Sequence, residues 1–150
     1  MKEKFKIQDE QYSFPYHHLV SFQPFNNYSV MSWGIEYYIY INKVIDIIKK
    51  IEFKSLLDVG CGEGKLILEL KKVLSSDKVL SGIDLSERVI LFARAFNYNN
   101  RAEFKCKNIS DVSDNYDIIT LIETIEHIPD EEVSSFIKNI FNKLNAGGSL

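Results

Sequence analysis

A glycine-rich loop directly after a short apolar run constrains this chain more than any other feature. Residues 55–59 form a mainly apolar run that contains Asp58, and Gly60, Gly62 and Gly64 follow it at every second position. Glycine has no Cβ, so it adopts tight-turn dihedrals readily and lets a ligand lie against bare backbone. Amides at the start of a following helix can bind a carboxylate or a phosphate. The segment therefore predicts a strand, a ligand-binding loop and a helix in succession.

The rest of the chain alternates between short apolar runs and longer segments of helical period. Strands are predicted at residues 55–59, 79–83, 102–105 and 116–122, and a fifth is expected to begin at 149–150 after a turn at 145–148. Helices are predicted at residues 34–51, 65–73, 87–97 and 131–144. This alternation is typical of a parallel sheet with helices on its faces. The expected fold class is α/β, with a doubly wound, mostly parallel sheet that stops after the start of its fifth strand.

Composition narrows the range of functions. A chain of 150 residues with 45% hydrophobic and 26% charged residues has the size and balance of one globular domain. The formal net charge of -3 gives no overall attraction for nucleic acid, which favours a small-molecule substrate. Cys61 and Cys106 are too few for a disulfide framework, and no apolar run suits a signal peptide or a membrane span. We therefore expect a cytoplasmic protein with no membrane partner.

Two regions are expected within the chain. Residues 1–33 have no clear period but are rich in aromatic side chains, which disordered tails lack, so we expect a lid or substrate segment there. Residues 34–150 are expected to form the ligand-binding core. Because the sheet would stop at its fifth strand, we expect a missing C-terminal segment or a partner chain to complete it.

The spacing of the glycine loop argues against two common nucleotide sites. The dinucleotide fingerprint G-x-G-x-x-G/A needs a small residue at its sixth position, where this chain has Lys65. The phosphate loop G-x-x-x-x-G-K-[ST] needs Ser or Thr after its lysine, where this chain has Leu66. A nicotinamide oxidoreductase is therefore disfavoured.

The remaining pattern, Asp58-x-Gly60-x-Gly62-x-Gly64 after an apolar strand, resembles the first motif of the Rossmann-like, class I S-adenosylmethionine-dependent methyltransferases. The resemblance covers residues 54–150. It implies that S-adenosylmethionine is the cofactor, that the loop passes its methionine part, and that Asp58 helps to fix the loop.

Later residues extend this resemblance. Asp84 at the end of the second predicted strand suits a bidentate hydrogen bond to two ribose hydroxyls, while Ser86 can cap the helix that follows. By resemblance Asn108 contacts adenine, although it can equally hold its own turn. The expected cofactor-binding residues are Asp58, Gly60, Cys61, Gly62, Asp84, Leu85, Asn108 and Ile109.

A Glu-x-x-Glu-His segment follows the fourth predicted strand. If it forms one helical turn, Glu123, Glu126 and His127 share a face, either as ligands for Mg²⁺ or Mn²⁺ or as an acid/base pair. The segment resembles the ubiquinone-biosynthesis O-methyltransferases. It equally resembles the methyltransferases of the 3'-terminal ribose of small RNAs, in which these letters bind magnesium together with a later His.

Two histidines, His17 and His18, lie among aromatic residues near the N-terminus. A lid built from this segment would exclude water from methyl transfer, and its aromatic rings could contact a sulfonium by cation–π attraction. Either histidine could then deprotonate an acceptor hydroxyl or amine. The alternative is that the aromatic side chains only cap an apolar face.

The resemblance predicts an enzyme that methylates an oxygen, nitrogen or carbon atom of a small molecule. Its rival is a metal-dependent 2'-O-methyltransferase of RNA 3' ends, and a third hypothesis is a non-catalytic S-adenosylmethionine-binding domain completed by a partner. The expected catalytic residues are His127, Glu123 and His18, and the expected metal ligands are Glu123, Glu126 and His127.

Overall fold

The described residues in the computed structural model are 6, 9–10, 22–25, 28–31, 33–98 and 101–150. The strands of the main sheet are β3 (Ser55–Val59), β4 (Val79–Asp84), β5 (Glu103–Cys106), β6 (Tyr116–Leu121) and β7 (Leu144–Ser149). The helices are α2 (Trp33–Ile48), α3 (Lys65–Val73), α4 (Glu87–Phe96) and α5 (Asp130–Phe141), with 3-10 turns η1 (Ile109–Asp111) and η2 (Ile125–His127). The element order confirms the alternation of strands and helices that the sequence predicts.

The strand order of the main sheet is β5-β4-β3-β6-β7, and each neighbouring pair is parallel. The chain builds outward from β3 to β5 and then returns to the other side of β3 with β6. The carboxyl ends of β3 and β6 therefore flank a topological switch point. Open α/β sheets bind their ligands at such a point.

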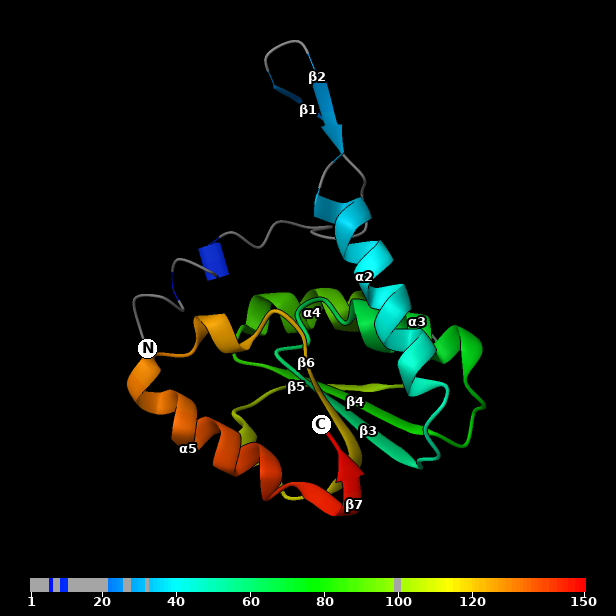
Figure 1. The fold of residues 1–150 in the computed structure, drawn as a ribbon, viewed down its shortest axis with the longest axis vertical. Coiled ribbons are helices and arrows are strands. Elements are labelled where there is room, and N and C mark those ends of the chain that lie inside the picture. The colour runs from blue at the N-terminus through cyan, green and yellow to red at the C-terminus, as the bar shows by residue number, and fades with distance from the viewer. Residues whose placement is uncertain (1–5, 7–8, 11–21, 26–27, 32, 99–100) are drawn as a thin grey trace.

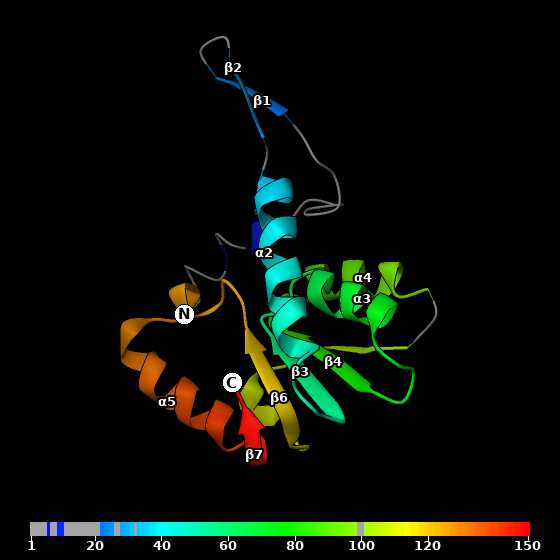
Figure 2. The ribbon, with the colours of Figure 1, turned by 45° about the vertical axis from the view of Figure 1, so that its right-hand side comes forward.

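Two apolar layers cover the sheet, because side chains alternate across each strand. Leu56 of β3 packs in a buried cluster with residues of α2, α3 and α4. Leu57 and Val59 point the other way and pack with Ile140 of α5. Figures 1 and 2 show α3 and α4 on one side of the sheet and α5 on the other. This arrangement confirms the expected doubly wound α/β class.

The boundaries around β7 differ from the prediction. Helix α5 ends at Phe141 rather than at 144, and β7 begins at Leu144 rather than at 149. Leu144 is paired with Tyr116 and Ser149 with Ile118, so four residues of β7 lie opposite one residue of β6. The predicted turn at 145–148 is thus a bulge inside the strand, with Gly147 at φ 80°.

One carboxylate holds together the amino ends of three strands. Asp117 Oδ2 accepts hydrogen bonds from Lys54 N at 2.7 Å and from Ser55 N at 2.9 Å. Asp117 Oδ1 accepts from Asn145 Nδ2 at 2.7 Å. These bonds, first the one from Asn145, lower the pKa of Asp117 to about 2. Asp117 therefore ties β3, β6 and β7 at the edge opposite the switch point.

The described part of the predicted lid includes an antiparallel hairpin, β1 (Phe22–Phe25) and β2 (Tyr28–Met31). Figures 1 and 2 show this hairpin beyond the N-terminal end of α2, away from the sheet. Among the helices of the described residues, none combines the length and apolar character needed to cross a membrane.

Candidate functional site

The glycine loop lies at the switch point and its amides are bonded within the protein. Gly60 N and Cys61 N both donate to Ile83 O of β4, at 2.8 and 3.0 Å, and Gly64 N donates to Cys61 O at 2.9 Å. Gly62 N donates to Asp84 Oδ2 at 3.0 Å. Most of the loop amides expected to bind an anion therefore already donate hydrogen bonds within the protein.

Two glycines of the loop face different surroundings. Both have left-handed backbones, with φ 75° at Gly60 and 52° at Gly62, a conformation that costs any residue with a Cβ. A Cβ on Gly60 would lie 2.4 Å from Thr124 Oγ1, whereas a Cβ on Gly62 would meet no atom within 4 Å. The backbone at Gly62 therefore borders open space and can be approached by a ligand.

Asp84 ends β4 beside this open space. Its Oδ2 accepts from Gly62 N, and its Oδ1 accepts from Ser86 N at 2.9 Å. Burial raises the pKa of Asp84, and the nearby charge of Asp9 raises it further. The backbone N–H of Leu85 is a third hydrogen-bond donor to Asp84, so of the roughly four acceptor positions on this carboxylate about one is left for a ligand hydroxyl. The predicted cap is confirmed separately, because Ser86 Oγ accepts from Val89 N at 3.2 Å.

Asp58 lies within β3, on the face covered by α2 to α4. Its Oδ1 accepts from Thr120 Oγ1 of β6 at 2.7 Å. Burial raises the pKa of Asp58 to about 7, against the opposing effect of the Thr120 hydrogen bond, and the charge of Asp84 adds to the rise. Asp58 is thus a buried link between the two strands of the switch point.

The other predicted cofactor residues fall into exposed and buried groups. Leu85 is exposed, and Asn108 Oδ1 accepts from Ser110 N at 3.1 Å, so Asn108 does hold its own turn. Ile109 and Cys61 are buried in the two apolar clusters. Burial raises the pKa of the Cys61 thiol well above its ordinary value. These four residues surround the carboxyl ends of β4 and β5 and the loop after β3.

The Glu-x-x-Glu-His segment does not form the expected helical turn. Glu123 has φ 50° and stands before η2, so it does not share a helical face with Glu126 and His127. His127 Nε2 lies 3.9 Å from Glu126 Oε1, and both side chains are nearly half exposed. Among the residues that the structure describes, no group of three or more His, Cys, Asp or Glu side chains is arranged to hold a metal ion. The three-ligand metal site expected from the spacing is not formed, because the left-handed residue interrupts the helical period.

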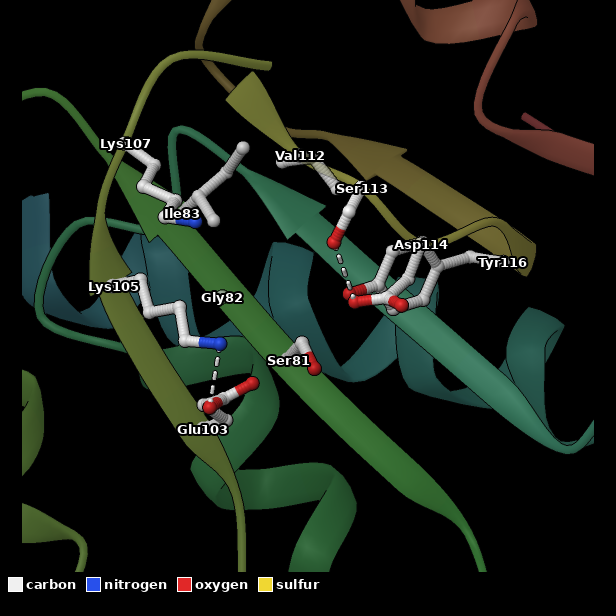
Figure 3. A pocket seen from close by; sticks show the side chains of 10 residues that line it. All are labelled: Ser81, Gly82, Ile83, Glu103, Lys105, Lys107, Val112, Ser113, Asp114 and Tyr116. Atoms are coloured by element: carbon white, nitrogen blue, oxygen red, sulfur yellow. Dashed lines mark hydrogen bonds and ion pairs between the residues drawn. The ribbon is translucent and has the colours of Figure 1, made fainter. Parts of the chain in front are cut away.

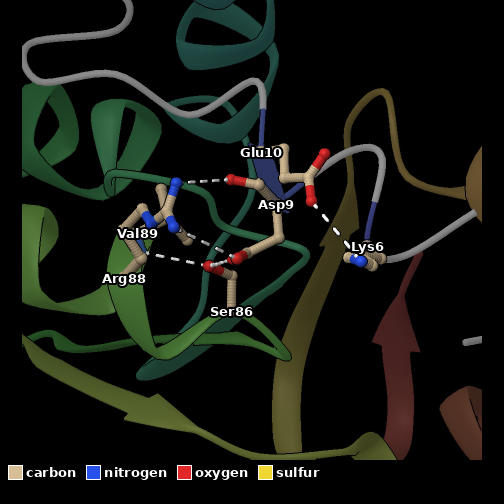
Figure 4. Close-up of polar contacts among 6 residues, drawn as sticks. All are labelled: Lys6, Asp9, Glu10, Ser86, Arg88 and Val89. Atoms are coloured by element: carbon tan, nitrogen blue, oxygen red, sulfur yellow. Dashed lines mark hydrogen bonds and ion pairs between the residues drawn. The ribbon is translucent and has the colours of Figure 1, made fainter. Parts of the chain in front are cut away.

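A short N-terminal stretch lies against the start of α4 (Figure 4). Asp9 accepts a hydrogen bond from Ser86 Oγ, and its backbone oxygen accepts from Arg88 Nη1 at 3.2 Å. Arg88 Nη2 also lies 3.9 Å from Asp9 Oδ2. The predicted base His18 and its neighbour His17 lie outside the described residues.

A hollow on the sheet does not belong to this site (Figure 3). Side chains of β4 and β5, including Ser81, Glu103 and Lys105, line it together with Tyr116. Between β5 and β6 the described chain forms the short 3-10 turn η1 and no longer helix. This face of β4 and β5 therefore has no longer helix over it among the described residues. No residue of the glycine loop lines the hollow.

Sequence reasoning missed three side chains that shape the site. Thr120 carried a signal, because it is a polar residue in a buried strand and Asp58 is another, and buried polar groups pair. Thr124 and Asp9 carried none. Their partners, Val59 and Ser86, lie 65 and 77 residues away along the chain.

Comparisons with known proteins agree with this geometry. Residues 56–148 match the family model described as a methyltransferase domain. The ubiquinone biosynthesis O-methyltransferase of Coxiella burnetii is 34% identical over 102 residues, which cover 65% of this chain and 42% of that protein. The enzyme of the same name from Hydrogenovibrio crunogenus is 37% identical over 95 residues, covering 57% of this chain and 38% of its own length. The chain therefore spans less than half the length of these two relatives.

A solved structure shares the fold. The magnesium protoporphyrin IX methyltransferase of Synechocystis PCC 6803, solved with bound S-adenosylmethionine, superposes with a TM-score of 0.66. The match has 19% identity and covers 75% of this chain and 56% of that one. At this identity the likeness shows the fold alone, while the family match covers more than half of the chain. The chain belongs to the methyltransferase domain family, within the class I S-adenosylmethionine-dependent methyltransferases.

Proposed function

We propose that this chain binds S-adenosylmethionine at the carboxyl edge of its sheet and takes part in methyl transfer to an oxygen of a small molecule. The observation that carries the proposal is the contact between Asp84 and Gly62 N at the switch point, 3.0 Å long. It places a carboxylate with spare lone pairs beside bare backbone. The names of the relatives from Coxiella burnetii and Hydrogenovibrio crunogenus support an oxygen acceptor.

The residues present fit this cofactor better than a phosphate-bearing nucleotide. Asp84 has three backbone donors, from Gly62, Ser86 and Leu85, and its carboxylate keeps room to accept from a ribose hydroxyl. The amides of Gly60, Cys61 and Gly64 are bonded to protein carbonyls and do not form a cradle for phosphate. Open space beside Gly62 leaves room for the ligand backbone.

The charges around the site also favour a cation. The charge of Asp84 raises the pKa of Asp58, and the charge of Asp9 raises the pKa of Asp84, so three carboxylates lie near one another here. S-adenosylmethionine supplies an electrophilic methyl group on a positively charged sulfonium. A positive ligand would offset the mutual repulsion of these carboxylates, whereas a phosphate would add to it.

Proton removal from the acceptor needs a base at the same edge. Glu123 and His127 are exposed there, on the loop that follows β6. We propose that His127 or Glu123 takes the acceptor proton. We also propose that the part of region 1–33 before the β1–β2 hairpin, with His18, covers the site as a lid, while the hairpin itself lies away from the sheet. The contact of Asp9 with Ser86 and Arg88 supports the lid, because it holds this stretch beside the end of β4.

Calorimetry with S-adenosylmethionine, S-adenosylhomocysteine and NAD tests the proposal. The chain is expected to bind the two S-adenosyl compounds and not NAD, and Asp84→Ala is expected to weaken their binding by at least about tenfold, the share of one charged hydrogen bond. Asp114→Ala is the matched control, since Asp114 is exposed and accepts a hydrogen bond from the neighbouring Ser113 Oγ. Binding of NAD alone, or equal affinity in Asp84→Ala and the wild type, would refute the cofactor assignment.

A further inference from the structure

Strand β5 forms one edge of the main sheet. It has β4 on one side, and no strand of the described residues pairs with its other side. Lys107 N donates to Asp84 O at 3.0 Å, so the odd-numbered residues of this segment bond to β4. A strand in a parallel ladder bonds to one neighbour through alternate residues, so the even-numbered residues present their amides and carbonyls to the open edge. An open edge of this kind is a template for pairing with another chain.

Side chains from α4 and its C-terminal end cover two of these outward carbonyls. Arg94 donates to Phe104 O from Nε at 3.1 Å and from Nη2 at 2.9 Å. Asn97 is buried, and its Nδ2 donates to Ala102 O, just before β5, at 2.7 Å. Lys71 Nζ of α3 donates in turn to Asn97 Oδ1. Two successive outward acceptors of the β5 edge are therefore taken by side chains of the same chain.

The strand is also fixed from the inner side, by the ring of Phe104. Phe104 is buried below the glycine loop. A Cβ on Gly64 would lie 2.6 Å from this ring, and a Cβ on Gly82 would lie 2.9 Å from it. Packing this close holds the backbone of β5 where Arg94 reaches it.

The exposed residues of this edge are complementary to a second copy of the same strand. An antiparallel pair of β5 strands centred on Phe104 would place Glu103 of each copy opposite Lys105 of the other. Opposite charges at such positions stabilise a pair of strands. Both side chains are about half exposed, with an ion pair of 2.7 Å between them within the chain. A second copy of this chain is therefore the partner that suits an uncovered β5 edge.

We propose that Arg94 and Asn97 close the β5 edge against pairing with a second copy of the chain. Such pairing needs the carbonyls of Ala102 and Phe104, so it must first break their bonds to Asn97 and Arg94. A hydrogen bond from a charged donor is stronger than one from a neutral amide, so an incoming strand gains less at Phe104 O than the guanidinium loses. The proposal is independent of the cofactor.

Two substitutions at Arg94 test this closure by analytical ultracentrifugation over a concentration series. Arg94→Met keeps the apolar stem and removes every donor, and it is expected to strengthen self-association by about tenfold or more, the factor of one charged hydrogen bond. Arg94→Lys keeps the charge but loses the two-donor fork, and an increase of about threefold is expected. Arg101→Met is the matched control, because Arg101 is exposed beside the same strand and its removal frees neither carbonyl. It is expected to behave as the wild type.

A thiol reporter locates the interface. Ala102→Cys introduces a thiol that lies opposite the exposed Cys106 of the other copy in the antiparallel pair, within disulfide reach. Within one chain the two positions are about 13 Å apart along the strand, too far for a disulfide. Oxidation is expected to give linked dimers when Ala102→Cys is combined with Arg94→Met and to leave Ala102→Cys alone monomeric. Adding Lys105→Glu to Arg94→Met is expected to abolish the dimer, because like charges then lie opposite each other.

Urea denaturation shows which variants are folded, and Arg94→Lys keeps the test decisive if Arg94→Met is not. Wild-type self-association in the folded Arg94 variants would overturn the proposal. Equal self-association of Arg101→Met would attribute the effect to net charge and overturn it too. Linked dimers in Ala102→Cys alone would show that the edge is open in the wild type, against the proposal. These experiments contain no S-adenosyl compound, so their failure is distinct from a failure of the proposed function.

Discussion

Substitution of two glycines in the same loop separates backbone strain from steric conflict. Gly60 and Gly62 both have left-handed backbones, at φ 75° and 52°, and alanine in that conformation costs roughly 1–2 kcal/mol. Alanine also restricts the unfolded chain, which offsets about 0.4–1 kcal/mol of this cost. Gly62→Ala is therefore expected to lower the free energy of unfolding by about 1 kcal/mol, since its Cβ meets no atom within 4 Å.

Gly60→Ala carries a second cost. Its Cβ would lie 2.4 Å from Thr124 Oγ1 and 2.7 Å from Thr124 Cγ2, so Thr124 or the loop must move. Shifts of this kind cost about 1–3 kcal/mol. The total expected loss in Gly60→Ala is about 2–4 kcal/mol, the sum of the net strain and this shift.

Urea denaturation of the wild type and both variants, without ligand, measures the two free energies. Calorimetry with S-adenosylmethionine is expected to rank the two variants in the opposite order, because the methyl group of Gly62→Ala enters the space proposed for the ligand. Gly62→Ala is expected to weaken binding by about tenfold or more, or about 1.4 kcal/mol, while remaining the more stable variant. Equal destabilisation of the two variants would refute the steric argument, and unimpaired binding by Gly62→Ala would place the ligand elsewhere.

Four further outcomes are expected. The raised pKa of Asp58, about 7, makes the wild type less stable as pH rises from about 4 to about 7. Asp58→Asn is expected to reduce this pH dependence of stability, which denaturation midpoints at several pH values measure. The lowered pKa of Asp117, about 2, means that its ionised form stabilises the wild type above about pH 4 and that this stability is lost as pH falls to about 2. Asp117→Asn is expected to lose less stability over that range. Denaturation midpoints that follow the wild type would contradict this. Asp9→Asn is expected to speed proteolysis near residues 6–10 and to change global stability by less than about 0.5 kcal/mol, and equal cleavage rates would count against the lid contact. Titration of magnesium by calorimetry is expected to give no binding that His127→Ala abolishes, and a clear isotherm lost in that variant would restore the metal site.

The elements around the glycine loop could be predicted because local sequence determines them. The run at 55–59 is bounded by glycine and the helix at 65–73 by its apolar period, and both match the structure to the residue. The start of β7 could not be predicted in this way. Its residues 145–148 have turn composition, and the strand is recognised through pairing with β6, a tertiary contact.

The site was harder to predict where its geometry depends on distant partners. The place of Asp84 and the loop glycines at strand ends could be predicted, because it follows from the strand pattern. The left-handed backbone of Glu123 has no signal in its residue type, since glutamate rarely adopts it. A helical period was therefore assumed through residues 123–127, and the predicted helical face shared by Glu123, Glu126 and His127 was wrong.

The hydrogen bonds of the glycine loop distinguish between ligand classes that the glycine spacing alone leaves open. A glycine loop before a helix ordinarily attracts anions through its free amides. Here Asp84 accepts from Gly62 N, and Ile83 O and Cys61 O accept from three other loop amides. The Gly62 amide thus already donates to a carboxylate of the protein, and the charge of that carboxylate repels an anion. A loop of this kind is suited to a ligand that offers a hydroxyl to Asp84, positive charge to the carboxylates around it and no phosphate to the loop amides, which is the chemistry of a sulfonium nucleoside.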